Sequence, residues 1–133
     1  MIESLSAPGA YRTQFTDGRH TNFCDVPAEN GGQDAEFCPM DLLPAALACC
    51  VNMTVRMYAD KHGIPLGEVR TKVELDRSVA EQPVFRYAIE LEGNFTAEQR
   101  DKLLLAAKAC PVRRILSKPV LFEELPPEPN LAL

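Results

Sequence analysis

The sequence of 133 residues has no tryptophan, only two histidines and no excess of positive charge. Its 14 Lys and Arg residues are outnumbered by 19 Asp and Glu residues, which gives a net charge of −5 at pH 7. Nucleic acids and anionic membranes attract positively charged proteins, so neither is an expected partner. The pair Gly31-Gly32 lacks the lysine and the strand-to-helix context of a phosphate-binding loop. These absences favour a small neutral or thiol-type substrate.

The start of the chain also lacks the features of an exported protein. Residues 1–6 have neither the basic start nor the apolar run of a signal peptide. The longest apolar stretch, residues 42–58, contains Asn52 and Arg56, so we expect a buried helix rather than a membrane span. These patterns predict a cytoplasmic protein. In that reducing compartment the five cysteines are not expected to form a disulfide framework, and a reactive thiol would serve catalysis or redox sensing.

Length and composition predict a single domain over residues 1–133. With 46% apolar and 25% charged residues, the composition is that of an ordinary globular protein. A chain of this length buries about two-thirds of its unfolded surface on folding. The proline-rich end, residues 126–133, is expected to be an extended and solvated tail.

Local patterns predict an N-terminal hairpin followed by a long helix. Residues 11–15 and 20–26 are β-prone and flank a turn, and residues 27–39 are expected to form a loop. Asp41 is expected to cap a helix from Leu42 to His62, which a following left-handed glycine ends. The first half of this helix is apolar on every side, which predicts a central place in the fold.

The second half of the chain predicts a second hairpin and two shorter helices. Residues 69–75 alternate between apolar and polar, and residues 84–91 repeat the pattern. Thr96 is expected to cap a helix that runs through Ala109, a short helix is expected over 112–117, and a last strand over 120–125. Because hairpins join most of the strands, the order predicts an α+β fold with antiparallel sheets rather than a doubly wound α/β fold.

The cysteines are the residues most able to carry chemistry. Cys49 and Cys50 are adjacent on the long helix, about 100° apart around its axis, so at most one can be a nucleophile at a given site. Cys110 precedes the short helix with Arg113 and Arg114 close by, which are neighbours that favour a thiolate. Two helix-associated thiols indicate a dithiol pair. The alternative is that these cysteines are core residues only, since free cysteine is among the most buried residue types.

A metal site is a second alternative. His20 and Cys24 are four residues apart and Cys38 could join them. This spacing matches no standard zinc pattern, and the chain has no C-x-x-C and no H-E-x-x-H motif. We therefore expect no bound metal.

Several segments match the motifs of one family. They are Gly18-Arg19-His20, Asp25-Val26-Pro27, Gly31-Gly32, residues 39–43, residues 45–50 with Met53-Thr54, and Ala109-Cys110-Pro111-Val112. Together they resemble the OsmC/Ohr superfamily of thiol-dependent peroxidases. The resemblance extends from about residue 18 to residue 125, and the helix cysteine with the later Cys-Pro-Val motif is its most specific part.

The resemblance implies an intertwined α+β homodimer with the long helices at its centre and two active sites at the subunit interface. It gives Cys50 the peroxidatic position, Cys110 the resolving position and Arg19 that of the activating arginine. The family reduces organic hydroperoxides: the first thiolate becomes a sulfenic acid, which condenses with the second thiol. No bound cofactor is implied. An external dithiol, of lipoyl type in one branch of the family, would reduce the disulfide bond.

An apolar pocket lined by Leu47, Met53 and Met57, together with partner residues, would favour organic hydroperoxides as substrates in an oxidative stress response. One position departs from the family pattern, because Met40 stands where its peroxidases carry a glutamate that anchors the arginine. Methionine cannot accept an ion pair. The alternative function is therefore an OsmC-like protein that binds a small apolar or thiol ligand, or senses oxidation, without significant peroxidase turnover.

Two carboxylates near this departure are candidates to orient Arg19. They are Glu36 and Asp41, although Asp41 is also the expected helix cap.

Overall fold

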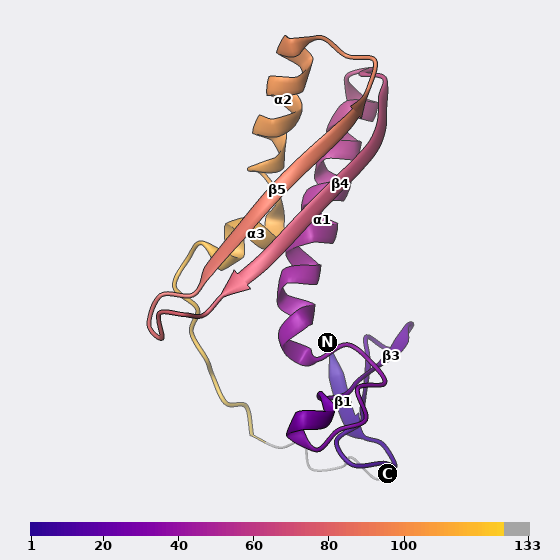
Figure 1. Cartoon of the computed structure of the whole chain (residues 1–133), viewed down its shortest axis with the longest axis vertical. Coiled ribbons are helices and arrows are strands. Elements are labelled where there is room, and N and C mark those ends of the chain that lie inside the picture. The colour runs from indigo at the N-terminus through magenta and orange to yellow at the C-terminus, as the bar shows by residue number, and fades with distance from the viewer. Residues whose placement is uncertain (127–133) are drawn as a thin grey trace.

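The computed structural model of the protein describes residues 1–126 and has an N-terminal sheet, one long helix, a long hairpin and two shorter helices (Figure 1). The elements are β1 (Glu3–Ser6), β2 (Thr13–Thr16), β3 (Thr21–Cys24), the short 3-10 turn η1 (Ala28–Asn30), α1 (Pro39–Lys61), β4 (Leu66–Asp76), β5 (Val84–Gly93), α2 (Ala97–Ala107) and α3 (Pro111–Leu116). The predicted α+β class with antiparallel sheets is confirmed. The expected C-terminal tail lies, apart from Pro126, outside the described residues.

The N-terminal sheet has the order β1-β2-β3 with antiparallel neighbours. The predicted hairpin is therefore present, with shorter strands. Its turn is held by the carboxylate of Asp17, which accepts hydrogen bonds from the backbone N–H groups of Arg19 at 2.8 Å and His20 at 2.7 Å. β1 lies outside the two segments predicted to form this hairpin, although the pattern allowed for two or three strands before the long helix. Its four residues are all exposed, so its sequence carries little of the alternation by which a half-buried strand is recognised.

Helix α1 begins three residues earlier than predicted, at Pro39 rather than Leu42. Cys38 is the N-cap residue, so the assignment of Asp41 to that position is wrong. Proline suits the first helical position because its missing N–H would have no partner there. Asp41 lies in the first turn, where a carboxylate interacts favourably with the positive end of the helix. The predicted end is confirmed, with His62 as C-cap and Gly63 left-handed at φ 60°.

One stripe of α1 forms the centre of the core. Its buried residues recur every four positions: Leu47, Val51, Val55 and Ala59. The helix packs against β4, α2 and α3. By length and composition alone α1 could cross a membrane, which is a property that core helices share. Its polar side chains make internal bonds here, because Asn52 donates to the carbonyl oxygen of Val69 at 2.6 Å and Arg56 to that of Leu66 at 2.7 Å.

The second hairpin and the capped helix are confirmed. β4 and β5 pair antiparallel, with Val69 opposite Leu91. Thr96 accepts a hydrogen bond from the N–H of Gln99 at 3.1 Å and its own N–H donates to the Gln99 side chain at 2.9 Å, which is a complete capping box. The short helix α3 begins at Pro111, one residue before the predicted start.

The predicted strand over residues 120–125 is wrong. These residues form no strand, and Phe122 is 95% exposed. Neither of the two sheets among residues 1–126 includes them as a strand.

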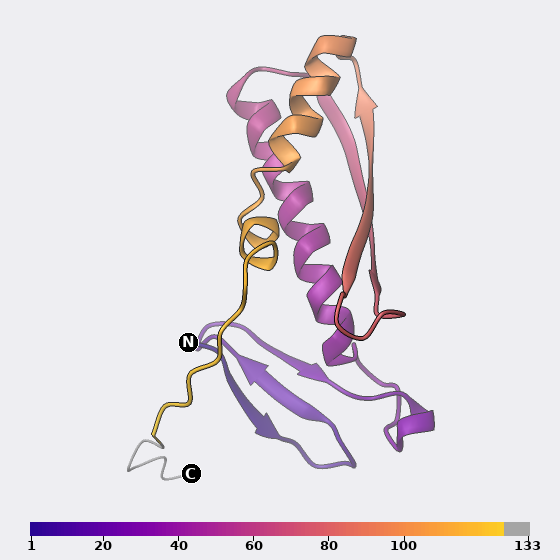
Figure 2. The same cartoon turned by 90° about the vertical axis from the view of Figure 1, so that its left-hand side faces the viewer.

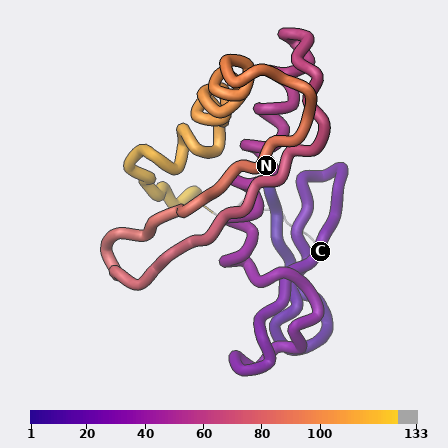
Figure 3. The backbone as a smooth tube through the Cα atoms, turned by 45° about the horizontal axis from the view of Figure 1, so that its top comes forward, coloured from indigo at the N-terminus to yellow at the C-terminus, as the bar shows by residue number. Residues whose placement is uncertain are grey.

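The N-terminal sheet and the remaining elements form two regions, which are joined mainly at the N-terminal end of α1. Figures 1 and 2 show the N-terminal sheet below the first turn of α1, while the β4–β5 hairpin, α2 and α3 lie along the helix. The backbone trace in Figure 3 shows the two sheets lying apart. Part of the apolar surface of α1 stays uncovered in the single chain, since Met53 is 63% and Met57 70% exposed.

An acid-sensitive contact closes the far end of the second hairpin. The backbone N–H of Ser78 donates to Asp76 at 2.8 Å, the Ser78 side chain adds a further bond, and Arg86 forms an ion pair with the same carboxylate. These bonds, led by that from the Ser78 N–H, lower the pKa of Asp76 from 3.8 to about 2. The ionised form therefore stabilises the fold fully above about pH 4, and this stabilisation is lost as the pH falls towards 2.

Replacing Asp76 with Asn is expected to lower the free energy of unfolding at neutral pH and to make its fall between pH 4 and pH 2 shallower. Urea unfolding at a series of pH values and one protein concentration measures both effects. The Asp101→Asn variant, altered on the exposed surface of α2, is the control. An acid dependence that matches the wild type in Asp76→Asn would contradict the role of this contact.

Candidate functional site

The structure brings the Cys50 and Cys110 thiols together. Cys50 lies in the middle of α1, and Cys110 is the N-cap residue of α3, which packs against α1. Cys110 is fully buried and Cys50 half-buried. The two thiols lie close enough for each to shift the pKa of the other, although sixty positions of sequence separate them.

The surroundings of this pair make the two thiols unequal. Burial raises the pKa of Cys50, but the nearby Cys110 thiol, the Val112 N–H and the Thr54 hydroxyl outweigh burial and bring the pKa below its ordinary value. The Thr54 hydroxyl itself donates to the backbone carbonyl oxygen of Cys50 at 2.7 Å. Burial raises the pKa of Cys110, and the nearby Cys50 thiol raises it further. Cys50 therefore ionises first, while Cys110 keeps its proton.

Backbone groups of α3 supply much of this stabilisation. The Val112 N–H lowers the pKa of Cys50, and the N–H groups of Val112 and Arg113 act in the same direction on the pKa of Cys110. The side chain of Arg113 instead donates to the hydroxyl of Tyr87 at 3.2 Å. The sequence pattern credited the two arginine side chains with favouring a thiolate, whereas the structure assigns that effect to the peptide N–H groups at the start of α3.

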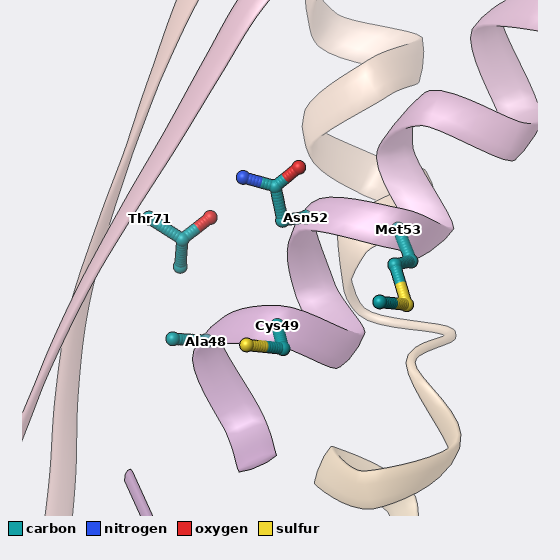
Figure 4. A pocket seen from close by; sticks show the side chains of 5 residues that line it. All are labelled: Ala48, Cys49, Asn52, Met53 and Thr71. Carbon is teal, nitrogen blue, oxygen red and sulfur yellow. The ribbon is translucent and has the colours of Figure 1, made fainter. Parts of the chain in front are cut away.

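Cys49 faces a different part of the surface, as its position on the helix predicts. It is exposed and lines a shallow hollow of about 240 Å³ between α1 and β4 (Figure 4). The other lining residues are Ala48, Asn52, Met53 and Thr71. The hydroxyl oxygen of Thr71 is buried and has no hydrogen-bond partner among the described residues.

The structure separates Arg19 from the cysteine pair within one chain. Arg19 lies in the exposed turn between β2 and β3, and it is not among the groups that shift the pKa of Cys50. Glu36, a candidate to orient Arg19, instead forms an ion pair with Arg12 at 3.1 Å. Met40 is 37% exposed in the first turn of α1.

The three predicted substrate-binding residues have different surroundings. Leu47 is only 2% exposed and belongs to the core, whereas Met53 and Met57 lie on the uncovered face of α1. Met53 lines the hollow beside Cys49.

A larger hollow of about 490 Å³ lies nearer the start of α1 and was not predicted. Its walls come from α1, α3 and the far end of the second hairpin: Met40, Leu43, Leu75, Arg77, Ala80, Pro83, Phe85 and Leu116. Leu43 precedes Cys50 by two helical turns, or about 10 Å along the axis. Because the lining residues belong to three separate elements, no local pattern marks them in the sequence.

The proposed metal ligands do not form a cluster. Within residues 1–126, no three His, Cys, Asp or Glu side chains gather as a group that could hold a metal ion. His20 instead lies 3.1 Å from the carboxylate of Asp17 in the exposed hairpin turn.

The helix cysteine, the buried second thiol and the antiparallel α+β architecture agree with one family. The family model described as OsmC-like protein matches residues 31–124. The chain belongs to the OsmC-like family. No curated protein gives a significant match to the sequence.

Solved structures of OsmC-like proteins have the same fold. A protein of Psychrobacter arcticus, described as an osmotic stress induced and detoxification response protein, is 21% identical with a TM-score of 0.70, and the match covers 86% of this chain and 85% of that one. An organic hydroperoxide resistance protein OsmC of Legionella pneumophila is 20% identical, with a TM-score of 0.62 and 88% of each chain covered. An OsmC-like protein of Mycoplasma pneumoniae is 16% identical, with a TM-score of 0.71, 87% of this chain and 85% of that one. At these identities the likeness shows the fold alone.

The effect of Cys110 on the pKa of Cys50 gives a direct test. Replacing Cys110 with Ala removes the neighbouring thiol, so the pKa of Cys50 is expected to rise, whereas Cys110→Ser keeps a polar donor at this position and is expected to raise it less. The pH dependence of Cys50 alkylation, followed by peptide mass spectrometry, measures this pKa. Equal midpoints in the wild type and Cys110→Ala would contradict the assigned interaction.

Proposed function

We propose that the protein is a homodimeric, cytoplasmic thiol peroxidase that reduces organic hydroperoxides through Cys50 and Cys110. The observation that supports it most is the packing of Cys110 against α1 beside Cys50, which lowers the pKa of Cys50 and raises that of Cys110. A peroxidase of this type needs one thiolate to attack and a nearby thiol to resolve. Membership of a family in which some structural relatives are named for organic hydroperoxide resistance agrees with this chemistry.

The reaction would proceed in two steps. The Cys50 thiolate attacks an oxygen of the hydroperoxide, the O–O bond breaks, and the alkoxide takes a proton and leaves as an alcohol, so that Cys50 becomes a sulfenic acid. The Cys110 sulfur then attacks the Cys50 sulfur, and the hydroxyl group leaves with the Cys110 proton as water. An external dithiol would reduce the resulting disulfide bond by thiol–disulfide exchange. No resident cofactor takes part.

Arg19 is proposed as the activating arginine, and the homodimer gives it a route to the site. Within one chain Arg19 lies in the exposed turn between β2 and β3, and the sheet of these strands lies below the first turn of α1 (Figure 2). A second copy would therefore have to supply the arginine, or the sheet that carries it would have to move. The uncovered apolar side chains Met53 and Met57 on α1 agree with a second copy at the centre of the molecule.

The organic part of the substrate is proposed to bind beside α1. The hollow next to Leu43 has mostly apolar walls and one cation, Arg77, and it lies about two helical turns from Cys50. Leu47 lies between Leu43 and Cys50 along the helix and would form the floor of the path between them. Met53 and Met57, expected to contribute to the pocket, would do so from the uncovered face of α1 in the homodimer.

A second function is favoured by Met40. No carboxylate stands at the position where the family's peroxidases anchor the activating arginine, and Glu36 is already paired with Arg12. Without a held arginine, the protein would bind a small apolar or thiol ligand, or sense oxidation, with little turnover. The experiments below separate the two functions.

The wild type is expected to consume cumene hydroperoxide in the presence of a lipoyl dithiol, and Cys50→Ser to reduce this to the uncatalysed rate, because no attacking thiolate remains. Cys110→Ser is expected to accumulate a sulfenic acid at Cys50, detectable by mass after trapping with dimedone. Cys49→Ser, changed at the exposed neighbouring thiol, is the matched control and should keep full activity. A wild type that forms no Cys50–Cys110 link and shows no turnover would favour the ligand-binding or sensing function.

The binding hollow has its own test. Replacing Leu43 with Ser removes apolar surface from the hollow, so the ratio of kcat/KM for cumene hydroperoxide to that for hydrogen peroxide is expected to fall by roughly tenfold. Steady-state kinetics with both substrates measures this ratio. Leu105→Ser, changed at an exposed position of α2 that lines neither of the two hollows, tests whether the loss is specific to this site. An unchanged ratio in Leu43→Ser would exclude the hollow as the site of the organic group.

A further inference from the structure

A second pair of cysteines lies at the two ends of the loop that joins β3 to α1; we call the place where these ends approach each other the neck of the loop. Cys24 ends β3 and is 6% exposed, while Cys38 is the half-buried N-cap residue of α1. The loop between them is held closed by the buried carboxylate of Asp25. This carboxylate accepts hydrogen bonds from the backbone N–H groups of Val26 at 2.8 Å, Gln33 at 3.0 Å and Ala35 at 3.3 Å.

The backbone brings the segments that carry the two cysteines together. The Asp25 N–H donates to the Phe37 carbonyl oxygen at 3.2 Å, and the Asp34 N–H donates to that of Val26 at 3.2 Å. Cys24 and Cys38 are the residues next to the two partners of the first bond, so their backbones lie close together.

This position suits a disulfide bond. In a regular antiparallel pair, the residues next to a hydrogen-bonded pair have Cα atoms about 4.5 Å apart, and the single Asp25–Phe37 bond brings Cys24 and Cys38 towards such a separation. Disulfide bonds need a Cα separation of about 4.4–6.8 Å.

The electrostatics of Cys24 agree with this proximity. Burial raises the pKa of the Cys24 thiol, and the charges of Cys38 and Glu36 raise it further. This effect agrees with the closeness of the two segments that the Asp25–Phe37 bond establishes.

We propose that Cys24 and Cys38 form a second redox-active dithiol, which hydroperoxides oxidise to a disulfide bond across the neck of this loop. Cys38, the more accessible of the two, attacks an oxygen of the hydroperoxide. The O–O bond breaks, the alkoxide takes a proton and leaves as an alcohol, and Cys38 becomes a sulfenic acid. Cys24 then attacks the Cys38 sulfur, and the hydroxyl group leaves as water with the Cys24 proton. Two thiols lose two electrons and one hydroperoxide gains them.

The proposed Cys24–Cys38 disulfide bond would restrict how the N-terminal sheet is oriented relative to α1. The elements β4, β5, α1, α2 and α3 pack on one another, and the strands β1–β3 pack mainly among themselves, so this loop is the main tie between the two regions. A covalent link across its neck limits the directions in which the sheet can leave the helix. The turn that carries Arg19 belongs to that sheet.

The test uses the full-length Cys50→Ser, Cys110→Ser variant, so that neither proposed peroxidase thiol can oxidise or exchange with the second pair. After exposure to cumene hydroperoxide, free thiols are blocked with N-ethylmaleimide, and the chain is cut with trypsin and a glutamate-specific protease. We expect residues 20–29 linked to residues 37–56, with a mass lower by two hydrogen atoms than the sum of the two peptides. Fragmentation of the linked peptide should locate the bond at Cys38 rather than Cys49.

Further variants provide the controls. Adding Cys49→Ser should leave the link in place, whereas adding Cys38→Ser should abolish it and leave Cys24 alkylated. The wild type, mapped in the same way, should contain the same link, which guards against altered folding of the variants. Cys24 and Cys38 both alkylated after oxidation of the wild type, or Cys24 linked to another cysteine, would overturn the proposal. Because the main variant lacks Cys50, its outcome does not depend on whether Cys50 is the peroxidatic residue.

Discussion

Burial of one stripe of α1 is the constraint on which the rest of the structure depends. Leu47, Val51, Val55 and Ala59 recur every four residues and are at most 2% exposed. The hairpin, α2 and α3 cover this stripe, so the helix determines where each of them lies. Residues at this spacing share one face of a helix, and their neighbours in sequence therefore fall on its two flanks.

The two flanks of the stripe have different chemical roles. Asn52, one residue after Val51, reaches the backbone of β4 and bonds to the carbonyl oxygen of Val69. Cys50, one residue before Val51, turns about 100° the other way and meets α3 at Cys110. Cys49, one further step around the helix, reaches the uncovered side. The difference between two adjacent cysteines thus follows from the core stripe.

The parts of the fold that the sequence predicted correctly are those governed by short-range rules. The capping box at Thr96 and Gln99, the left-handed Gly63 and the alternation of β4 each depend on residues within a few positions of one another. The incorrect predictions concern segments whose secondary structure depends on pairing with residues far away in the sequence. The apolar segment 120–125 would pair only if a sheet edge lay beside it, and β1 pairs although its residues are exposed.

The features of the candidate site also fall into two groups, those that the sequence predicted and those that depend on tertiary packing. Spacing on the helix separated Cys49 from Cys50, and the family resemblance indicated Cys110 as the partner thiol. That the start of α3 favours the thiolate through its N–H groups, while Arg113 turns to Tyr87, depends on tertiary packing that no local pattern contains. The hollow beside Leu43 likewise combines three elements.

Both cysteine pairs combine one buried thiol with one more accessible thiol. Cys110 and Cys24 are buried, whereas Cys50 and Cys38 are half-buried. Burial raises the pKa of Cys110 and of Cys24 and limits access to them, so the oxidant meets the other member first. Cys38 and Cys50 lie on the same helix but are twelve residues apart, or about 18 Å along its axis. At that separation a rigid helix prevents exchange between them, so each pair would respond to an oxidant independently of the other.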